Sequence, residues 1–228
     1  MSRNSPPSLW DSFWAEHASS DKLFHRLSWR IRLLFSHAYA NHLLKIPHRN
    51  SPAWVLEVGC GSARTLHYLN VRLPHSQCFA LDLSPEALKI VRQISPDFLS
   101  AVADASHLPL ASQAFHVTFS IGLIEHFDRA MAAGMVREMA RVTEADGLVA
   151  VMVPWRTSFY NLIRKAFGQR WPFGQEHPFR RGELACFMTN QGLQDVRIHV
   201  VYGSTLLAIA HKPYEEGNAP SKPIITSP

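Results

Sequence analysis

The sequence predicts an α/β protein whose seven strands form a mostly parallel sheet with helices on both faces. Apolar runs typical of buried strands alternate with helical patterns between residues 53 and 153, and this alternation requires parallel strands joined by crossover helices. Two further strands follow, at 193–200 and 204–211, with only the link Tyr202-Gly203-Ser204 between them. Because a link this short joins antiparallel neighbours, the sheet is expected to end in a C-terminal antiparallel hairpin.

Local patterns place each element along the chain. Residues 9–44 carry apolar side chains at spacings of three and four, which predicts helix. Ser84-Pro85 is typical of a helix start, with serine at the cap and proline at the first helical position. The expected order is helix 9–44, strand 53–58, helix 62–73, strand 78–83, helix 84–94, strand 98–102, strand 115–121, helix 128–142, strand 148–153, helix 181–191 and the final hairpin.

The chain is expected to form one main domain. With 228 residues, 46% hydrophobic and 18% charged, it is long and apolar enough for one full core. We expect an N-terminal helical cap over 1–52, a domain over 53–212 with a lid-like insertion at 155–179, and a flexible tail over 213–228. No secretory signal or membrane-length apolar run is visible, and the three cysteines form no CxxC pair. These features favour the cytoplasm and predict no metal site.

Positive charge gathers in two segments outside the middle of the chain. Residues 1–52 carry a net charge of +4 and residues 155–182 one of +5, whereas the whole chain carries +5. The second segment interleaves basic and aromatic side chains, which suits a hydrophobic or planar acceptor that carries negative charge. The same pattern also suits a membrane surface or a nucleic-acid backbone. The alternative is a lid packed on its own domain, which alone would explain most of the aromatic residues. The basic and aromatic residues of the segment are Trp155, Arg156, Phe159, Tyr160, Arg164, Lys165, Phe167, Arg170, Trp171 and Phe173.

The stretch Val55 to Arg64 contains the clearest candidate for a ligand site. A buried strand ends at Glu57-Val58 and passes through Gly59-Cys60-Gly61 into a helix. The glycines permit backbone angles closed to other residues, and the first N–H groups of the helix favour an anionic group. Acidic residues also end the next two strands, and ligands of parallel sheets bind at these carboxyl ends. We therefore expect a small anionic or zwitterionic cofactor here.

The glycine pattern distinguishes between cofactors. A nicotinamide-binding turn has a third glycine where this chain has Arg64. The stretch instead has the form E/D-x-G-x-G-x-G with Ala63 in the last glycine place, and it resembles motif I of the class I S-adenosylmethionine-dependent methyltransferases. The segment 115–120 looks like the strand-4 motif of that family, with His116 in place of its usual acid, and 123–127 matches its small-molecule branch.

The resemblance implies a Rossmann-like fold and S-adenosyl-L-methionine as the cofactor. In that family the acid ending the second strand holds the ribose hydroxyls, and Asp82 matches it. The acid after the third strand meets the adenine amino group, and Asp104 matches it with Ala105 alongside. The implied cofactor-binding residues are Glu57, Gly59, Cys60, Gly61, Asp82, Leu83, Asp104, Ala105, Ser120 and Ile121.

His126 is the candidate catalytic residue, because it follows strand 115–121 and an imidazole can take the proton of a hydroxyl acceptor. A structural role for His126 is an equal alternative. Glu125 could cap the following helix or contact the acceptor, and the helix cap is the expectation. We expect methyl transfer to a small, hydrophobic metabolite. One alternative is an RNA methyltransferase, but the sequence contains no clear nucleic-acid-binding motif. The other is a non-catalytic cofactor-binding module with peripheral membrane contact. The sequence gives no indication of the oligomeric state.

Overall fold

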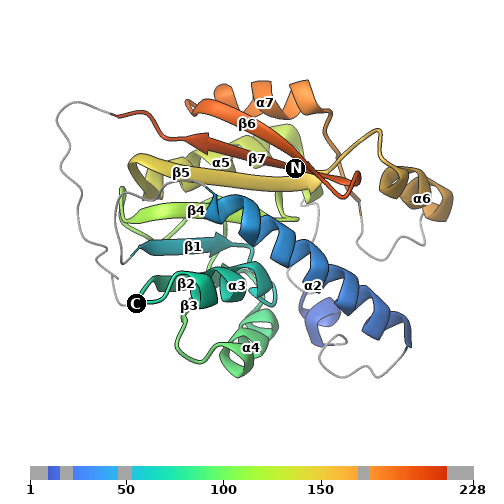
Figure 1. Cartoon of the computed structure of the whole chain (residues 1–228), viewed down its shortest axis with the longest axis horizontal. Coiled ribbons are helices and arrows are strands. Elements are labelled where there is room, and N and C mark those ends of the chain that lie inside the picture. Colours follow the sequence, from blue (N-terminus) through green and yellow to red (C-terminus); the bar gives the residue numbers. More distant parts are fainter. Residues whose placement is uncertain (1–9, 16–22, 46–52, 169–174, 215–228) are drawn as a thin grey trace.

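A seven-stranded sheet in the order β3-β2-β1-β4-β5-β7-β6 forms the centre of the computed structural model, which describes residues 10–15, 23–45, 53–168 and 175–214. Figure 1 shows the sheet with its covering helices. The strands are β1 (Trp54–Val58), β2 (Gln77–Asp82), β3 (Leu99–Val102), β4 (Phe115–Ile121), β5 (Thr143–Pro154), β6 (Gln194–Val201) and β7 (Thr205–His211).

Helices connect the strands. They are α2 (Leu23–Leu44), α3 (Arg64–Arg72), α4 (Pro85–Ile94), the short 3-10 helix η1 (Ile124–His126), α5 (Arg129–Val142), α6 (Phe159–Phe167) and α7 (Arg181–Thr189), and residues 10–15 form a further short helical segment. The expected single helix 9–44 is therefore described as two pieces, and residues 16–22 lie outside the described residues. Strand β5 begins at Thr143, five residues before its expected start.

The predicted topology is confirmed. Strands β1 to β5 pair in parallel, whereas β7 is antiparallel to both β5 and β6. The final hairpin closes where Val201 pairs with Thr205. Consequently β1, β2, β3 and β4 all end at the same edge of the sheet.

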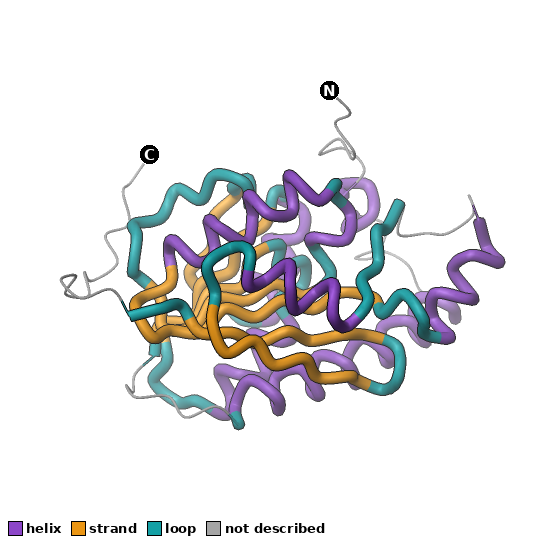
Figure 2. Tube along the Cα trace, turned by 90° about the horizontal axis from the view of Figure 1, so that it is seen from above, coloured by secondary structure: helices purple, strands orange, loops and turns teal. Residues whose placement is uncertain are grey.

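Two apolar layers cover the two faces of the sheet, as the near-continuous apolar strands require. On one face Met135 and Met139 of α5 pack beside Leu184 of α7. On the other face Leu43 of α2 and Leu66 of α3 pack together with side chains of α4. Figure 2 shows helices on both sides of the strands. Among the described residues, no helix is both long and apolar enough to cross a membrane.

The two ends of the segment between β5 and α7 lie side by side at the sheet. Trp155 forms a parallel bridge with Phe179, and the Arg156 N–H donates to the Phe179 carbonyl over 2.8 Å. Figure 1 shows α6, which this segment contains, beside the tip of the β6–β7 hairpin. The expected insertion 155–179 thus starts and ends at one point of the fold. Its residues Arg170, Trp171 and Phe173 lie outside the described residues.

Candidate cofactor and acceptor site

The glycine turn after β1 has the backbone conformation that the sequence predicts for it. Gly59 and Gly61 have φ angles of 64° and 51°, in the left-handed region that favours glycine. The Cys60 N–H donates to the Leu81 carbonyl over 2.9 Å and so fixes the turn against the end of β2. Ala63 also lies in this region, with φ 49°, directly before α3. Because alanine adopts it at a cost of about 1 kcal/mol, the turn is strained at the position where motif I has its last glycine.

Two buried carboxyl groups hold this turn in place. Glu57 Oε2 accepts from the Leu66 N–H over 3.2 Å. Asp82 accepts from the Gly61 N–H over 2.7 Å with Oδ2, and from the Ser84 N–H over 2.9 Å with Oδ1. Burial raises the pKa of Glu57 to about 8, and it raises the pKa of Asp82 against the lowering effect of its backbone donors. Asp82 therefore links the glycine turn of β1 to the start of α4.

The end of β3 lies beside the end of β2, because the Ala103 N–H donates to the Asp82 carbonyl over 3.0 Å. This contact places Asp104 one strand away from Asp82. Asp104 is exposed, and its Oδ1 accepts from the Ser106 N–H over 2.8 Å. Leu83 leaves 38% of its surface exposed, whereas Ala105 is buried. The two acids thus follow neighbouring strand ends, and the partly exposed Leu83 comes directly after Asp82.

At the end of β4, Ser120 is fully buried, and its Oγ has no hydrogen-bond partner among the described residues. Ile121 is half-buried beside it. The ten expected cofactor residues therefore lie at the carboxyl ends of four adjacent strands or in the links that follow them.

The short helical segment 10–15, part of the expected N-terminal cap, lies on this strand edge. Asp11 Oδ1 accepts from the Ser84 hydroxyl over 2.5 Å. A Cβ added to Gly61 would lie 2.3 Å from the Trp14 ring, so this position must be glycine while Trp14 stays there. The aromatic, helical pattern of residues 9–14 predicts a helix but does not identify the strand ends that it contacts.

His126 is buried at the same edge, in η1 after β4. Its Nδ1 lies 3.3 Å from the Gln175 carbonyl, and its ring packs against Trp10 with 4.9 Å between centroids. Because a carbonyl only accepts hydrogen bonds, Nδ1 carries the proton and Nε2 is the acceptor. Burial lowers the pKa of His126 to about 4, so the imidazole is neutral at pH 7.

The expected helix-capping role of Glu125 is wrong. Asp128 is the N-cap of α5, and its Oδ1 accepts from the N–H groups of Ala130 and Met131 over 3.0 and 2.9 Å. Asp128 directly precedes the helix, whereas Glu125 belongs to the 3-10 helix η1 and is buried. A carboxyl at the cap position itself satisfies the first helical donors, which leaves Glu125 for another role.

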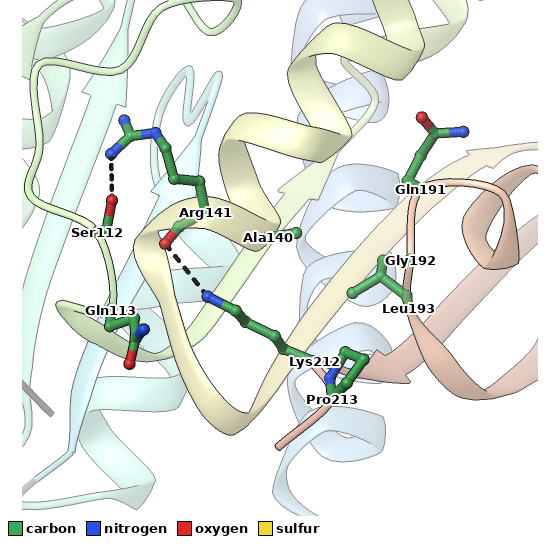
Figure 3. Close-up of a pocket in the computed structure, with 9 residues that line it drawn as sticks. All are labelled: Ser112, Gln113, Ala140, Arg141, Gln191, Gly192, Leu193, Lys212 and Pro213. Carbon is green, nitrogen blue, oxygen red and sulfur yellow. Dashed lines mark hydrogen bonds between the residues drawn. The ribbon is translucent and has the colours of Figure 1, made fainter. Parts of the chain in front are cut away.

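A pocket of about 450 Å³ lies at the other end of α5 (Figure 3). Lys212 crosses it and donates to the carbonyls of Arg141 and Thr143 over 3.5 and 2.8 Å. None of the expected site residues lines this pocket. Its lining residues are Ser112, Gln113, Ala140, Arg141, Gln191, Gly192, Leu193, Lys212 and Pro213.

Residues 55–147 match a family model described as a methyltransferase domain. The chain is 30% identical over 117 residues to the malonyl-[acyl-carrier protein] O-methyltransferase of Dechloromonas aromatica, over 51% of this chain and 42% of that protein. It is 29% identical over 150 residues to a probable tRNA methyltransferase 9B of Mus musculus, over 56% of this chain and 31% of that protein. The chain thus spans less than half the length of either curated relative.

A solved structure shares the fold over nearly its whole length. The magnesium protoporphyrin IX methyltransferase of Synechocystis, crystallised with bound SAH, has a TM-score of 0.66 at 10% identity, over 90% of this chain and 97% of that one. The family model covers β1 through the start of β5, the same strands whose ends form the site. Residues 55–147 therefore match a methyltransferase domain, and the fold of the chain is shared with solved methyltransferases.

Proposed function

We propose that the chain transfers a methyl group from S-adenosylmethionine to a small, hydrophobic metabolite in the cytoplasm. The observation that carries this proposal is the Asp82 carboxylate, which is held by two backbone N–H groups between the glycine turn and the start of α4. Asp82 and the exposed Asp104 follow the ends of the neighbouring strands β2 and β3, and the apolar side chain of Leu83 is partly exposed after Asp82. A nucleoside has hydroxyl and amino donors around an apolar ring, so these side chains fit it.

The proposed cofactor residues divide by strand. Glu57 and the turn Gly59-Cys60-Gly61 hold the amino-acid part, Asp82 and Leu83 the ribose, and Asp104 and Ala105 the adenine. Ser120 and Ile121 of β4 complete the site toward the acceptor. When bound, the cofactor supplies a methyl group activated by a positively charged sulfur. The protein contributes mainly by holding the acceptor in line with that carbon.

For a hydroxyl acceptor, we propose His126 as the base. Its neutral imidazole presents Nε2 as an acceptor because Nδ1 faces the Gln175 carbonyl. It can therefore take a proton at pH 7 without first losing one. Its pKa of about 4 lies below the range near pH 7 that suits a general base best, so a structural role of His126 stays the alternative.

We also propose the division of the chain into a cap, a methyltransferase domain, a lid and a tail with the bounds given above. Tyr39 of α2 supports the cap, because its hydroxyl hydrogen-bonds Thr205 Oγ1 over 2.9 Å and its ring is buried on the sheet. The paired ends of segment 155–179 support the lid. The tail from residue 215 lies outside the described residues.

A screen for methyl transfer tests the proposal directly. Cofactor labelled on its methyl group is incubated with the chain and, in separate reactions, with small-molecule extract, lipid extract and total RNA of the source organism. We expect label in an apolar, low-molecular-weight fraction. Label in RNA would instead support the second candidate, an RNA methyltransferase, which the 29% identity to a probable tRNA methyltransferase favours. No label in any fraction would contradict both.

Helix α6 favours peripheral membrane contact as an accompanying role. Phe159 and Leu162 are 72% and 63% exposed on this helix, and Lys165 is exposed beside them. An exposed apolar face flanked by positive charge suits an anionic lipid surface. Sedimentation with phosphatidylglycerol vesicles should therefore exceed sedimentation with phosphatidylcholine vesicles, and Leu162→Glu should abolish the difference. Equal sedimentation with both would remove this role.

A further inference from the structure

One carboxyl oxygen at the strand edge lacks a partner. Glu125 of η1 is 3% exposed, and its Oε2 makes no hydrogen bond within the described part of the chain. Its main chain is fixed, because its carbonyl accepts from the His177 N–H over 2.6 Å. Leaving such a group buried without a donor costs about 1–3 kcal/mol, and more when it is charged. Because the backbone of Glu125 is held in place while its carboxyl oxygen lacks a donor, we infer that a ligand supplies the donor.

The glycine at position 122 keeps space beside this carboxyl. Gly122 has φ 73°, and a Cβ added there would meet only Glu125 Oε1 at 3.5 Å and the Met152 methyl at 3.8 Å. These are ordinary contact distances, so the backbone approaches the carboxyl without enclosing it tightly. The Glu125 carboxyl therefore lies between the ends of β4 and β5, next to the proposed cofactor residue Ile121.

A second carboxyl lies nearby on the lid segment. Glu176 is buried, and its Oε1 accepts from the Tyr160 hydroxyl of α6 over 3.0 Å. The Arg164 Nε lies 3.7 Å from its Oε2, so this cation is placed beside Glu176. Another cation, the half-buried Arg32, lies over the rings of Phe13 and Trp14. No ion pair described for the chain involves Glu125.

Electrostatics therefore favour a positive ligand at Glu125. Burial raises the pKa of Glu125 well above its usual range, and the charge of Glu176 raises it further. The raised pKa means that the unliganded site favours the neutral carboxylic acid, and a cation beside it would restore the carboxylate. A hydroxyl supplies only a donor, whereas an amine supplies both N–H donors and that positive charge.

We propose that Glu125 binds an amino group of the methyl acceptor, with Glu176 as a second acid close by. The assignment rests on the proposed methyl transfer and narrows its acceptor to apolar molecules that carry an amine. Glu125 acts here in binding, and the methylated atom is a separate question.

Selective blocking of amines tests this without knowledge of the acceptor. A small-molecule extract is divided, and one half is treated with sulfosuccinimidyl acetate, which acetylates amines, and then freed of reagent. With labelled cofactor, we expect transfer into the untreated half and at least a tenfold loss in the treated half. Equal transfer into both halves would overturn the assignment and leave the proposed function intact. Transfer into neither would overturn the proposed function, and the assignment with it.

The variant Glu125→Gln keeps the shape of the side chain and removes its charge. We expect kcat/KM for the labelled acceptor to fall about 10- to 100-fold, as for loss of a hydrogen bond between charged groups. The affinity for S-adenosylhomocysteine should stay within about twofold, which distinguishes an effect on acceptor binding from an effect on cofactor binding.

Glu144→Gln is the matched control, because Glu144 lies near the start of β5 and pairs with His116. An equally small effect of both variants would contradict the assignment. If Glu125→Gln fails to fold, the comparison of the two extract halves decides alone.

Discussion

The proposed cofactor side, with Glu57 and Asp82, and the proposed acceptor side, with Glu125 and Glu176, both contain buried acids, but they differ at Glu125. Asp82 accepts hydrogen bonds from two backbone N–H groups and Glu57 from one, all within the described fold. Glu125 has an oxygen without a donor in the same part of the chain. The first arrangement shapes the protein itself, because the carboxylates hold a turn. The second is incomplete without a ligand.

Removing Asp82 should have the largest effect on the cofactor side. Asp82→Ala takes away the acceptor for the N–H groups of both Gly61 and Ser84. We expect S-adenosylhomocysteine affinity to fall about 100-fold in calorimetric titration, since hydrogen bonds to a charged group contribute about 1.5–3 kcal/mol each. Asp97→Ala at an exposed loop position is the control. Similar affinities for the two variants would show that Asp82 does not organise the site.

Gly61→Ala should have the next largest effect. The new Cβ would meet Trp14 at 2.3 Å on a backbone with φ 51°. Overpacking adds about 1–3 kcal/mol to a backbone cost of about 1–2 kcal/mol, measured as the free energy of unfolding in urea. Gly192→Ala is the matched control, because its φ is 83° and an added Cβ would meet nothing within 4 Å. The larger loss of unfolding free energy in Gly61→Ala therefore measures the clash with Trp14. Equal losses in the two variants would show that Trp14 does not pack against Gly61.

His126 should show a smaller effect that depends on pH. Its pKa is about 4 in the folded chain and about 6.5 in the unfolded chain. As the pH falls below 6.5, the unfolded state binds the proton first, so stability is lost until about pH 4. Between pH 7 and pH 5 this loss should be about 2 kcal/mol. Urea unfolding of His126→Asn at both pH values should show that the substitution removes this loss of unfolding free energy. A loss of the same size in His126→Asn would mean that other groups cause it.

The cofactor side could be predicted from the sequence because its parts are local. A glycine turn, a strand-ending acid and a serine cap each follow from a few consecutive residues, and the parallel sheet brings them to one edge. The acceptor side combines distant segments. Trp14 reaches Gly61, and Tyr160 reaches Glu176 beside Glu125. No periodicity links such residues, so Glu125 was assigned to the nearest local role, a helix cap, which Asp128 fills instead.

Titration of the wild-type chain with S-adenosylhomocysteine tests the central claim most directly. If the glycine turn and Asp82 form the cofactor site, calorimetry should show one site per chain with a Kd on the order of 1–100 μM. Weakening of this binding in Asp82→Ala, with the Asp97→Ala control unchanged, would place the ligand at the turn. The absence of binding at about 1 mM to a folded wild-type chain would contradict the account.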